Sequence, residues 1–213
     1  MTVTRPLKPF PDKANAAIES EVKLLFAKGI FLRMHMKQLS PRQKQRILRS
    51  NMNAVEKYLP TVNFNGYRQI DKVKARFCVE ERAQVREEYA PDEAESPTLS
   101  IAAIFTLAQI PAVENRFIMV GDVGSAYLNA DLPMGKPDKI LHMYIDKNVA
   151  DAIIKQDISF SRYWRHNRGL VVRLDKALCG CIESAKLWYN EIAGTIRSNG
   201  VMVQDLVPHS YPL

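Results

Sequence analysis

The chain has 213 residues, of which 46% are hydrophobic and 25% charged, with a formal net charge of +7. This length and composition exclude a disordered or fibrous chain and fit one globular domain, or two small lobes, with an apolar core. The N-terminus lacks the apolar stretch of a secretory signal, and no run approaches the roughly 20 apolar residues that span a bilayer. We therefore expect an intracellular protein that makes no contact with a membrane.

The positive charge is unevenly placed, because most of the surplus of lysine and arginine lies between residues 28 and 86. A surplus of this kind suits a partner made of phosphates, and such binding would depend on salt. A solvated basic face that only favours solubility explains the same charge. The charge alone leaves both interpretations open.

The three cysteines, Cys78, Cys179 and Cys181, form an odd set. No second pair of Cys or His residues stands at the spacing of a zinc site. We expect reduced thiols that bind no metal.

The first half of the chain predicts two helices. Asp12 precedes an amphipathic stretch that Gly29 ends. Residues 40–43, Ser-Pro-Arg-Gln, combine a Ser cap, a Pro in the first turn and a Gln three residues after the cap. The pattern predicts a helix that starts here and carries basic residues as far as Arg49.

A β-hairpin is predicted next. Two β-like runs, 53–59 and 67–79, flank a turn-rich segment that contains Asn65-Gly66. An Asn-Gly pair between such runs is the strongest short hairpin signal in this sequence.

The second half predicts further helices and strands after a charged connection over residues 80–97. Ser96 or Thr98 is expected to cap a helix that runs through Ile101, Ile104, Phe105 and Leu107 and ends or kinks at Pro111. The remaining expected elements are strands at 117–120, 140–145 and 170–174 and helices at 147–154 and 183–198. The sequence as a whole predicts an α+β fold.

Residues 117–133 say most about function. The apolar residues 117–120, followed by Gly121 and Asp122, predict a buried strand that delivers one carboxylate to its exposed end. Hard divalent cations prefer carboxylate and carbonyl oxygens. The small residues 124–126 leave room for a bulky charged ligand, and Tyr127 could line one side of its pocket. An aspartate that caps a turn after an ordinary core strand explains the local pattern more simply.

This segment resembles the first catalytic motif of reverse transcriptases from Ty1/copia-type retrotransposons, which is an apolar strand, Asp, and then Ala-Phe/Tyr-Leu-Asn. Further blocks resemble the same family in the same order. They are Lys74-Ala75-Arg76-Phe77, Ser96-Pro97-Thr98, and Leu174-Asp175-Lys176-Ala177-Leu178 with Gly180 to Tyr189. The blocks cover roughly residues 15 to 200, and their order makes the resemblance specific.

The resemblance implies the fingers of a reverse transcriptase at about residues 15–95 and a partial palm at about 96–213, incomplete at the C-terminus. It implies template-directed DNA synthesis by two-metal phosphoryl transfer, from deoxynucleotides on an RNA or DNA template-primer. Asp122 and the backbone carbonyl of Val123 would then be ligands of Mg²⁺ or Mn²⁺. Proteins of this family are normally part of a Gag-Pol-type polyprotein, in a cytoplasmic particle or the nucleus.

The resemblance also implies which residues hold the deoxynucleotide. Lys74 and Arg76 alternate with apolar residues, so both can point to solvent from one strand face, and Arg offers planar, bidentate donors to phosphate. Tyr127 would clash with a ribose 2′-hydroxyl, and Gly180 permits close approach of the backbone. A solvated strand face and a core aromatic are the structural alternatives.

The chain departs from the family in one major respect. The family supplies a second carboxylate pair in a Tyr/Phe-x-Asp-Asp hairpin, whereas no Asp-Asp pair occurs in these 213 residues. One carboxylate cannot hold two metal ions, so we expect this chain to be inactive as a polymerase by itself. In addition, Cys179 stands where the family usually has Tyr. The alternative is a non-catalytic retrotransposon remnant that binds nucleic acid through its basic half.

Overall fold

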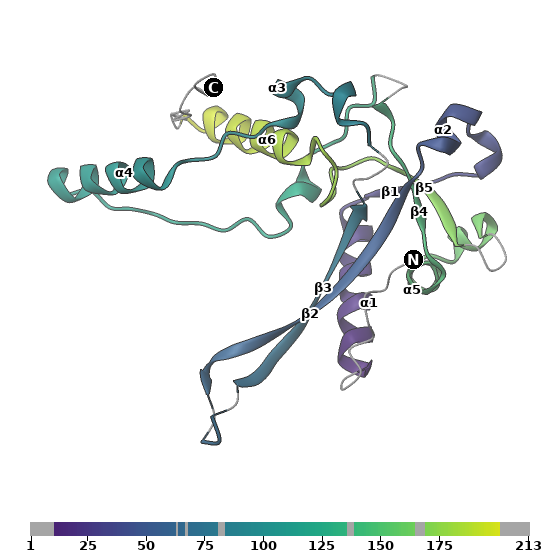
Figure 1. Ribbon diagram of the computed structural model, residues 1–213, viewed down its shortest axis with the longest axis horizontal. Helices are drawn as coiled ribbons and strands as arrows, with labels where there is room; N and C mark the ends of the chain where they lie inside the picture. Colours follow the sequence, from purple (N-terminus) through teal and green to yellow (C-terminus); the bar gives the residue numbers. More distant parts are fainter. Residues whose placement is uncertain are drawn as a thin grey trace.

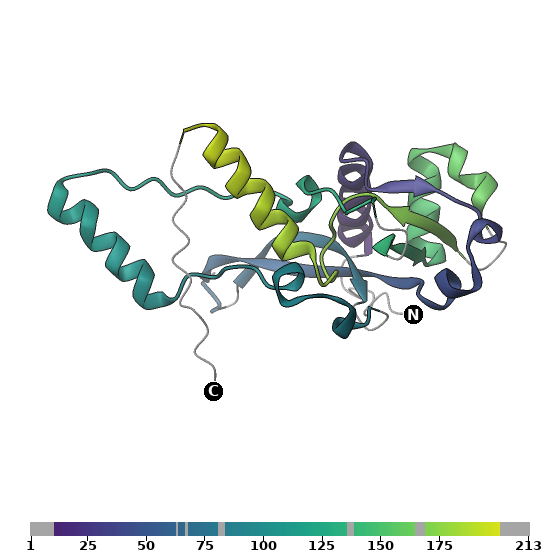
Figure 2. The same ribbon diagram turned by 90° about the horizontal axis from the view of Figure 1, so that it is seen from above.

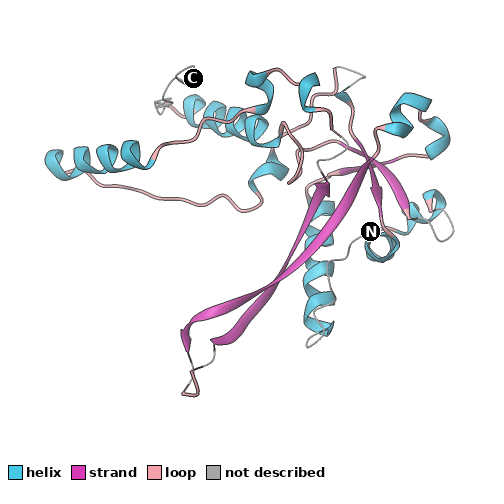
Figure 3. Cartoon of the chain, viewed as in Figure 1, coloured by secondary structure: helices cyan, strands magenta, loops and turns pink. Residues whose placement is uncertain are grey.

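The computed structural model describes residues 11–62, 64–66, 68–80, 84–135, 139–164 and 169–200. Helices and strands alternate irregularly along the chain (Figure 3). In chain order, the described elements are α1 (Pro11–Ala27), β1 (Phe31–Arg33), η1 (Met36–Gln38), α2 (Pro41–Gln45), β2 (Leu48–Val62), β3 (Arg68–Glu80), η3 (Arg86–Glu88), α3 (Pro91–Ala94), α4 (Ile101–Glu114), η4 (Ala126–Asn129), β4 (His142–Ile145), α5 (Lys147–Gln156), η6 (Ile158–Tyr163), β5 (Leu170–Leu174) and α6 (Ser184–Ser198).

A mixed sheet forms the centre of the described structure. Its five strands lie in the order β1-β5-β4-β2-β3 (Figure 1). The neighbours pair antiparallel, apart from β2 and β4, which pair parallel. Helices together with a mixed sheet make an α+β fold, so the predicted fold class is confirmed at this level.

The core lies where α1 and α5 pack together beside the sheet. Leu25 of α1, Ile153 of α5 and Met143 of β4 are fully buried in one apolar cluster. Burying a side chain of this size stabilises a fold by roughly 1.5–3 kcal/mol. Phe77 of β3 and Phe31 of β1 meet edge to face, with ring centroids 5.9 Å apart, and so join the two ends of the sheet to the same core.

The predicted hairpin is confirmed, and it is the longest feature of the sheet. Strands β2 and β3 project well beyond the other strands (Figure 1), and Gly66 in the turn has a φ of 78°. Their register shifts between Lys57 and Val62. Pro60 lies within this stretch and has no N–H to donate to a ladder. β2 starts at Leu48, earlier than the sequence pattern indicated.

The first helix ends at the predicted glycine and the second starts at the predicted cap, with one correction. Gly29, with a φ of 65°, follows the end of α1. Ser40 accepts a hydrogen bond from the backbone of Gln43 (3.2 Å), whose side chain accepts one from the Ser40 backbone (2.9 Å). The prediction that this helix reaches Arg49 is wrong, because the chain turns at Arg46 and Leu48 enters the core as the first residue of β2.

Helix α4 differs from its predicted start and end. Its N-cap is Ser100, which accepts a hydrogen bond from the backbone of Ala103 (3.1 Å), rather than Ser96 or Thr98. The helix also continues through Pro111 to Glu114. The carbonyl of Pro111 still accepts hydrogen bonds at the end of the helix, where Asn115 adopts a left-handed conformation with a φ of 52°. None of the residues of α4 is buried.

The predicted buried strand at 117–120 is wrong. These residues form no strand, and Phe117, Met119 and Val120 are 102%, 96% and 90% exposed. A strand becomes buried only when it finds neighbours. Here the segment runs back from α4 in an arm that lies apart from the sheet in both views (Figures 1 and 2). Among the described residues it pairs with none.

The elements after this arm agree with the sequence pattern. Strand β5 covers the predicted residues 170–174, and α5 and α6 coincide with the predicted helices to within two residues. Strand β4 begins at His142, two residues later than expected. No helix in the described ranges combines the length and the apolar character that crossing a bilayer requires.

Candidate functional site

A cavity of about 280 Å³ opens between α1, β3, η4 and the loop that precedes α6. Its lining is more apolar than polar, and it combines segments from distant parts of the chain. The lining residues are Glu21, Lys74, Arg76, Phe77, Ser125, Ala126, Tyr127, Leu128, Leu178 and Cys179.

Strand β3 supplies the positive charge of this cavity. Ala75 and Phe77 are buried in the core, whereas Lys74 and Arg76, which alternate with them, are exposed. This alternation follows from the pleat of a strand, which sends successive side chains to opposite faces. The predicted shared face of Lys74 and Arg76 is confirmed.

The turn η4 supplies the opposite wall. Leu128 is buried in the core and anchors the turn, while its neighbour Tyr127 is half-buried at the cavity. Asn129 closes the turn, since its side-chain amide donates to the carbonyl of Ala126 (3.2 Å). The side chain of Lys28, at the end of α1, donates to the Asn129 side chain (2.6 Å). The turn is therefore fixed both to the core and to α1.

The segment after η4 pairs with the segment after β5. The backbone N–H of Leu132 donates to the carbonyl of Asp175 (3.0 Å), and that of Ala177 donates to the carbonyl of Ala130 (2.9 Å). Two of the sequence blocks, 117–133 and 174–189, therefore lie side by side. The third block, 74–77, faces them across the cavity.

Gly180 lies against the backbone of β3. It has a φ of 93°, and a Cβ added there would stand 2.0 Å from the carbonyl oxygen of Val79. The backbone N–H of Val79 donates to the carbonyl of Cys179 (2.7 Å). Only glycine combines this conformation with this approach. The close approach at Gly180 is therefore to β3, and its predicted contact with the nucleotide stays a prediction.

Glu21 was missed by the sequence analysis. It comes three residues after Ile18 and four before Leu25, so it lies on the apolar face of α1, and this placement was the available signal. Its carboxylate accepts a hydrogen bond from the backbone of Phe77 (3.1 Å). The cavity therefore holds one carboxylate beside the charges of Lys74 and Arg76.

The structure brings together some of the predicted site residues but not all of them. Lys74, Arg76 and Tyr127 line one cavity, and Gly180 directly follows its lining residue Cys179. Asp122 and Val123 lie outside that lining, in the exposed segment before η4. Asp122 therefore does not lie at the end of a buried strand, where the sequence pattern had placed it.

The described residues do not fit a two-metal site. Asp122 is exposed, and within the ranges that the structure covers no group of three His, Cys, Asp or Glu side chains could hold a metal ion. Two bridged divalent ions need several oxygen ligands at a fixed separation. We therefore derive no catalytic step through a metal ion.

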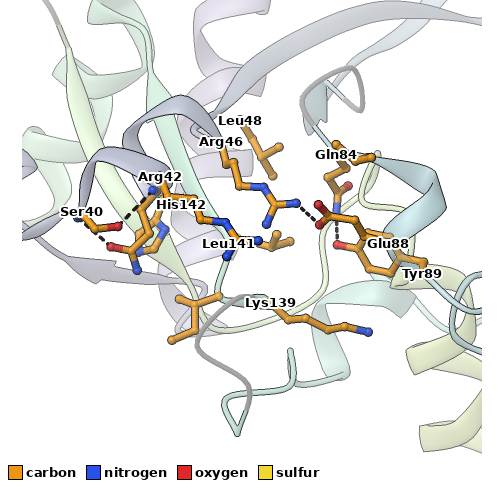
Figure 4. Close-up of a pocket in the computed structure, with 13 residues that line it drawn as sticks. Ser40, Arg42, Arg46, Leu48, Gln84, Glu88, Tyr89, Lys139, Leu141 and His142 are labelled. Atoms are coloured by element: carbon orange, nitrogen blue, oxygen red, sulfur yellow. Dashed lines mark hydrogen bonds and ion pairs between the residues drawn. The ribbon is translucent and has the colours of Figure 1, made fainter.

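A second cavity of about 280 Å³ lies between α2, η3 and β4 (Figure 4). Its basic side chains include Arg46, which forms an ion pair with Glu88, and Lys139, which forms one with Glu93. Lys139 also lies 5.1 Å from the ring centroid of Tyr89. These ion pairs offset the charges of Arg46 and Lys139, while Arg42 adds a further cation to the lining, so this cavity competes with the first for an anionic ligand.

A partly buried polar network joins the 84–89 segment to the start of α6. The Gln84 amide donates to the carboxylate of Glu183 (2.9 Å) and accepts from the backbone of Ile182 (3.0 Å). The Tyr89 hydroxyl lies 3.4 Å from Glu183. Burial, and then the Glu183 carboxylate, raise the pKa of Tyr89 to about 12. These contacts hold the base of α6 and hence the loop that carries Gly180.

Comparison of the sequence with protein-family models, with curated proteins and with solved structures finds no match. The function therefore has to be argued from the cavity and from the motifs that meet there.

Proposed function

We propose that this chain is the fingers and partial palm of a Ty1/copia-type reverse transcriptase, and that the cavity holds the incoming deoxynucleoside triphosphate. One observation carries the proposal. Three sequence blocks that resemble this family, far apart in the chain, converge on a single cavity that contains Lys74, Arg76 and Tyr127.

Each lining residue has a chemical role in this proposal. Arg76 binds phosphate oxygens through its planar donors, and Lys74 adds a second positive charge. The ring of Tyr127 stands against the sugar and disfavours a 2′-hydroxyl. Glu21 fixes α1 to the backbone of β3 and partly offsets the positive charge of the cavity.

In the intact protein the proposed activity is template-directed DNA synthesis with Mg²⁺ or Mn²⁺ on a template-primer. The proposal assigns Asp122 and the carbonyl of Val123 to the metal ions. These two groups do not complete such a site, so the proposal for this chain is limited to nucleotide binding.

The proposal is tested by measuring the affinity of the protein for a fluorescent deoxynucleoside triphosphate. The buffer contains a chelator. We expect Arg76→Gln to weaken binding by about tenfold or more, since a hydrogen bond to a charged group contributes roughly 1.5–3 kcal/mol. Lys72→Gln is the matched control, because Lys72 is exposed on the same strand but does not line the cavity. Equal losses in the two variants would contradict the proposal.

Glu21→Gln gives a test of opposite sign. The amide oxygen of Gln can still accept from Phe77, while the negative charge is lost. Binding of the triphosphate should therefore become tighter in the chelator-containing buffer. Weaker binding would show that the triphosphate does not lie in this cavity.

Tyr127 is tested by comparing deoxyribonucleotide with ribonucleotide. Tyr127→Ala should reduce the preference for the deoxyribonucleotide, whereas Tyr127→Phe, which retains the ring, should preserve it. A preference that survives in Tyr127→Ala would overturn the role assigned to the ring.

A non-catalytic, nucleic-acid-binding remnant is the second candidate. It is favoured by the exposed position of Asp122 and by the absence, among the described residues, of any group of three His, Cys, Asp or Glu side chains that could hold a metal ion. Triphosphate binding separates the two candidates: binding that Arg76→Gln weakens supports the reverse transcriptase fragment. Absence of saturable triphosphate binding, with duplex binding that weakens steeply with salt, supports the remnant.

A further inference from the structure

Two cysteines from distant parts of the chain lie opposite each other beside the cavity. Cys78 in β3 and Cys179 in the loop before α6 form an isolated parallel bridge pair. The side chains of Cys78 and Cys179 lie within hydrogen-bonding reach of each other. The neighbouring N–H of Val79 donates to the carbonyl of Cys179 (2.7 Å), which fixes the two backbones relative to each other.

This placement suits a disulfide. Paired strands lie roughly 4.7–4.9 Å apart, and a disulfide joins Cα atoms that are roughly 4.4–6.8 Å apart. The close contact of Gly180 with Val79 holds the loop against β3. The two sulfurs can therefore be joined with little movement of the backbone.

The surroundings of the two thiols give them different reactivity. The hydrogen bond from Cys78, together with the nearby Arg76, lowers the pKa of Cys179 to about 6, although partial burial opposes this. The same hydrogen bond and burial raise the pKa of Cys78, and Glu21 adds to this effect. Cys179 is exposed and Cys78 is half-buried, so Cys179 is the more accessible and the more acidic of the two thiols.

Cys181 provides an internal comparison. It is buried, and burial raises its pKa to about 12. Reactivity of a cysteine depends on thiolate content and on access. Cys181 lacks both, although it stands only two residues from Cys179.

We propose that Cys179 and Cys78 form a peroxide-oxidised pair, in which Cys179 is the attacking thiolate and Cys78 is the resolving thiol. The Cys179 sulfur attacks one oxygen of hydrogen peroxide. The O–O bond breaks, a sulfenic acid forms, and the other oxygen leaves as water after it takes up a proton. The sulfur of Cys78 then attacks the Cys179 sulfur, a disulfide forms, and the hydroxyl leaves as a second water. Two thiols lose two electrons in total, and one peroxide is reduced.

The modification site belongs to the wall of the cavity. Oxidation removes the thiolate charge next to Arg76 and ties β3 to the loop that carries Gly180. This chemistry does not require that the cavity binds a nucleotide, so it can be tested separately from the proposed function.

The test treats the reduced full-length chain with hydrogen peroxide, alkylates the remaining thiols, and identifies linked peptides by mass spectrometry without reduction. We expect one linked pair, Cys78–Cys179, and an alkylated Cys181. Cys181→Ser should oxidise as fast as the wild type. Cys179→Ser should react at least about tenfold more slowly, because it lacks the thiolate.

Cys78→Ser should stop at the sulfenic acid of Cys179, which dimedone traps. Arg76→Gln should slow the first step by removing the cation that favours the thiolate. In the wild type, a linked peptide that contains Cys181, or the absence of a linked Cys78–Cys179 peptide, would overturn the proposal. This outcome does not depend on whether the variants fold. Oxidation of Cys179→Ser at the wild-type rate would also overturn it.

Discussion

At the scale of single residues, the closest contact is that of Gly180 with β3. A Cβ at this position would stand 2.0 Å from a backbone oxygen, and the φ of 93° disfavours any side chain. We expect Gly180→Ala to lower the free energy of unfolding by about 2 kcal/mol or more, as measured by urea denaturation.

Gly194 is the matched control for this change. It lies within α6, and a Cβ there meets no atom within 4 Å. Gly194→Ala should stabilise the protein by about 0.5–1 kcal/mol, because alanine favours the helix. If both substitutions change the free energy of unfolding by the same amount, the contact of Gly180 with Val79 does not contribute to stability.

His142 makes stability depend on pH. It is only 4% exposed, and burial, followed by the charge of Arg173, lowers its pKa. The folded protein therefore binds this proton more weakly than the unfolded chain does. The contribution of neutral His142 to the free energy of unfolding is fully present above the ordinary histidine pKa of about 6.5. It falls as the pH drops below that value.

Urea midpoints at pH 7 and pH 5 measure this effect. The loss on acidification should be smaller in His142→Gln than in the wild type. The exposed residue His35 gives the control, and His35→Gln should retain the wild-type loss. An unchanged loss in His142→Gln would contradict the assignment.

At the scale of elements, α4 stands apart from the other long helices. It has no buried residue, whereas α5 buries Val149, Ala150, Ala152 and Ile153. A helix of this length is marginal in water unless tertiary packing supports it. We expect the amides of α4 to exchange with deuterium far faster than those of α5.

Hydrogen exchange followed by mass spectrometry compares the two helices in one sample. Protection in α5 should approach that of global unfolding, while α4 exchanges through local opening. Equal protection of the two helices would show that the arm packs against the rest of the protein.

Local signals in the sequence predicted most elements, because the signals and the structure depend on the same nearby residues. The Ser40 cap, the Asn65-Gly66 turn and the apolar run of β5 each act within a few residues. The run at 117–120 failed as a strand, because burial depends on a neighbouring strand that no local pattern specifies. Pro111 is not the end of its helix, because the helix continues to Glu114 and Asn115 closes it; the alternative of a kink at Pro111 stays a prediction.

The candidate site was partly predictable. Strand alternation indicated that Lys74 and Arg76 share a face, and the resemblance added Tyr127 and Gly180. Neither could show that α1 reaches the same cavity through Glu21, because that contact joins residues 56 positions apart. The pairing of Cys78 with Cys179 was likewise invisible, since it depends on how the loop meets β3.

At the scale of the whole molecule, an α+β core carries two projections, the β2–β3 hairpin and the α4 arm (Figures 1 and 2). The candidate cavity lies where β3 of the hairpin meets η4, which follows the arm. The second cavity, with Arg46 and Lys139, competes for any anionic ligand. The central claim is therefore that the cavity lined by Lys74, Arg76 and Tyr127, rather than the second cavity, holds the triphosphate.

Mapping backbone amide NMR shifts during titration with a deoxynucleoside triphosphate tests this claim most directly. The account predicts the largest shifts at residues 74–78, 125–128 and 179–180, with the second cavity largely unaffected. Shifts concentrated at residues 42–46, 84–89 and 139–142 would contradict it and place the anion in the second cavity. Absence of saturable shifts would remove nucleotide binding from this chain altogether.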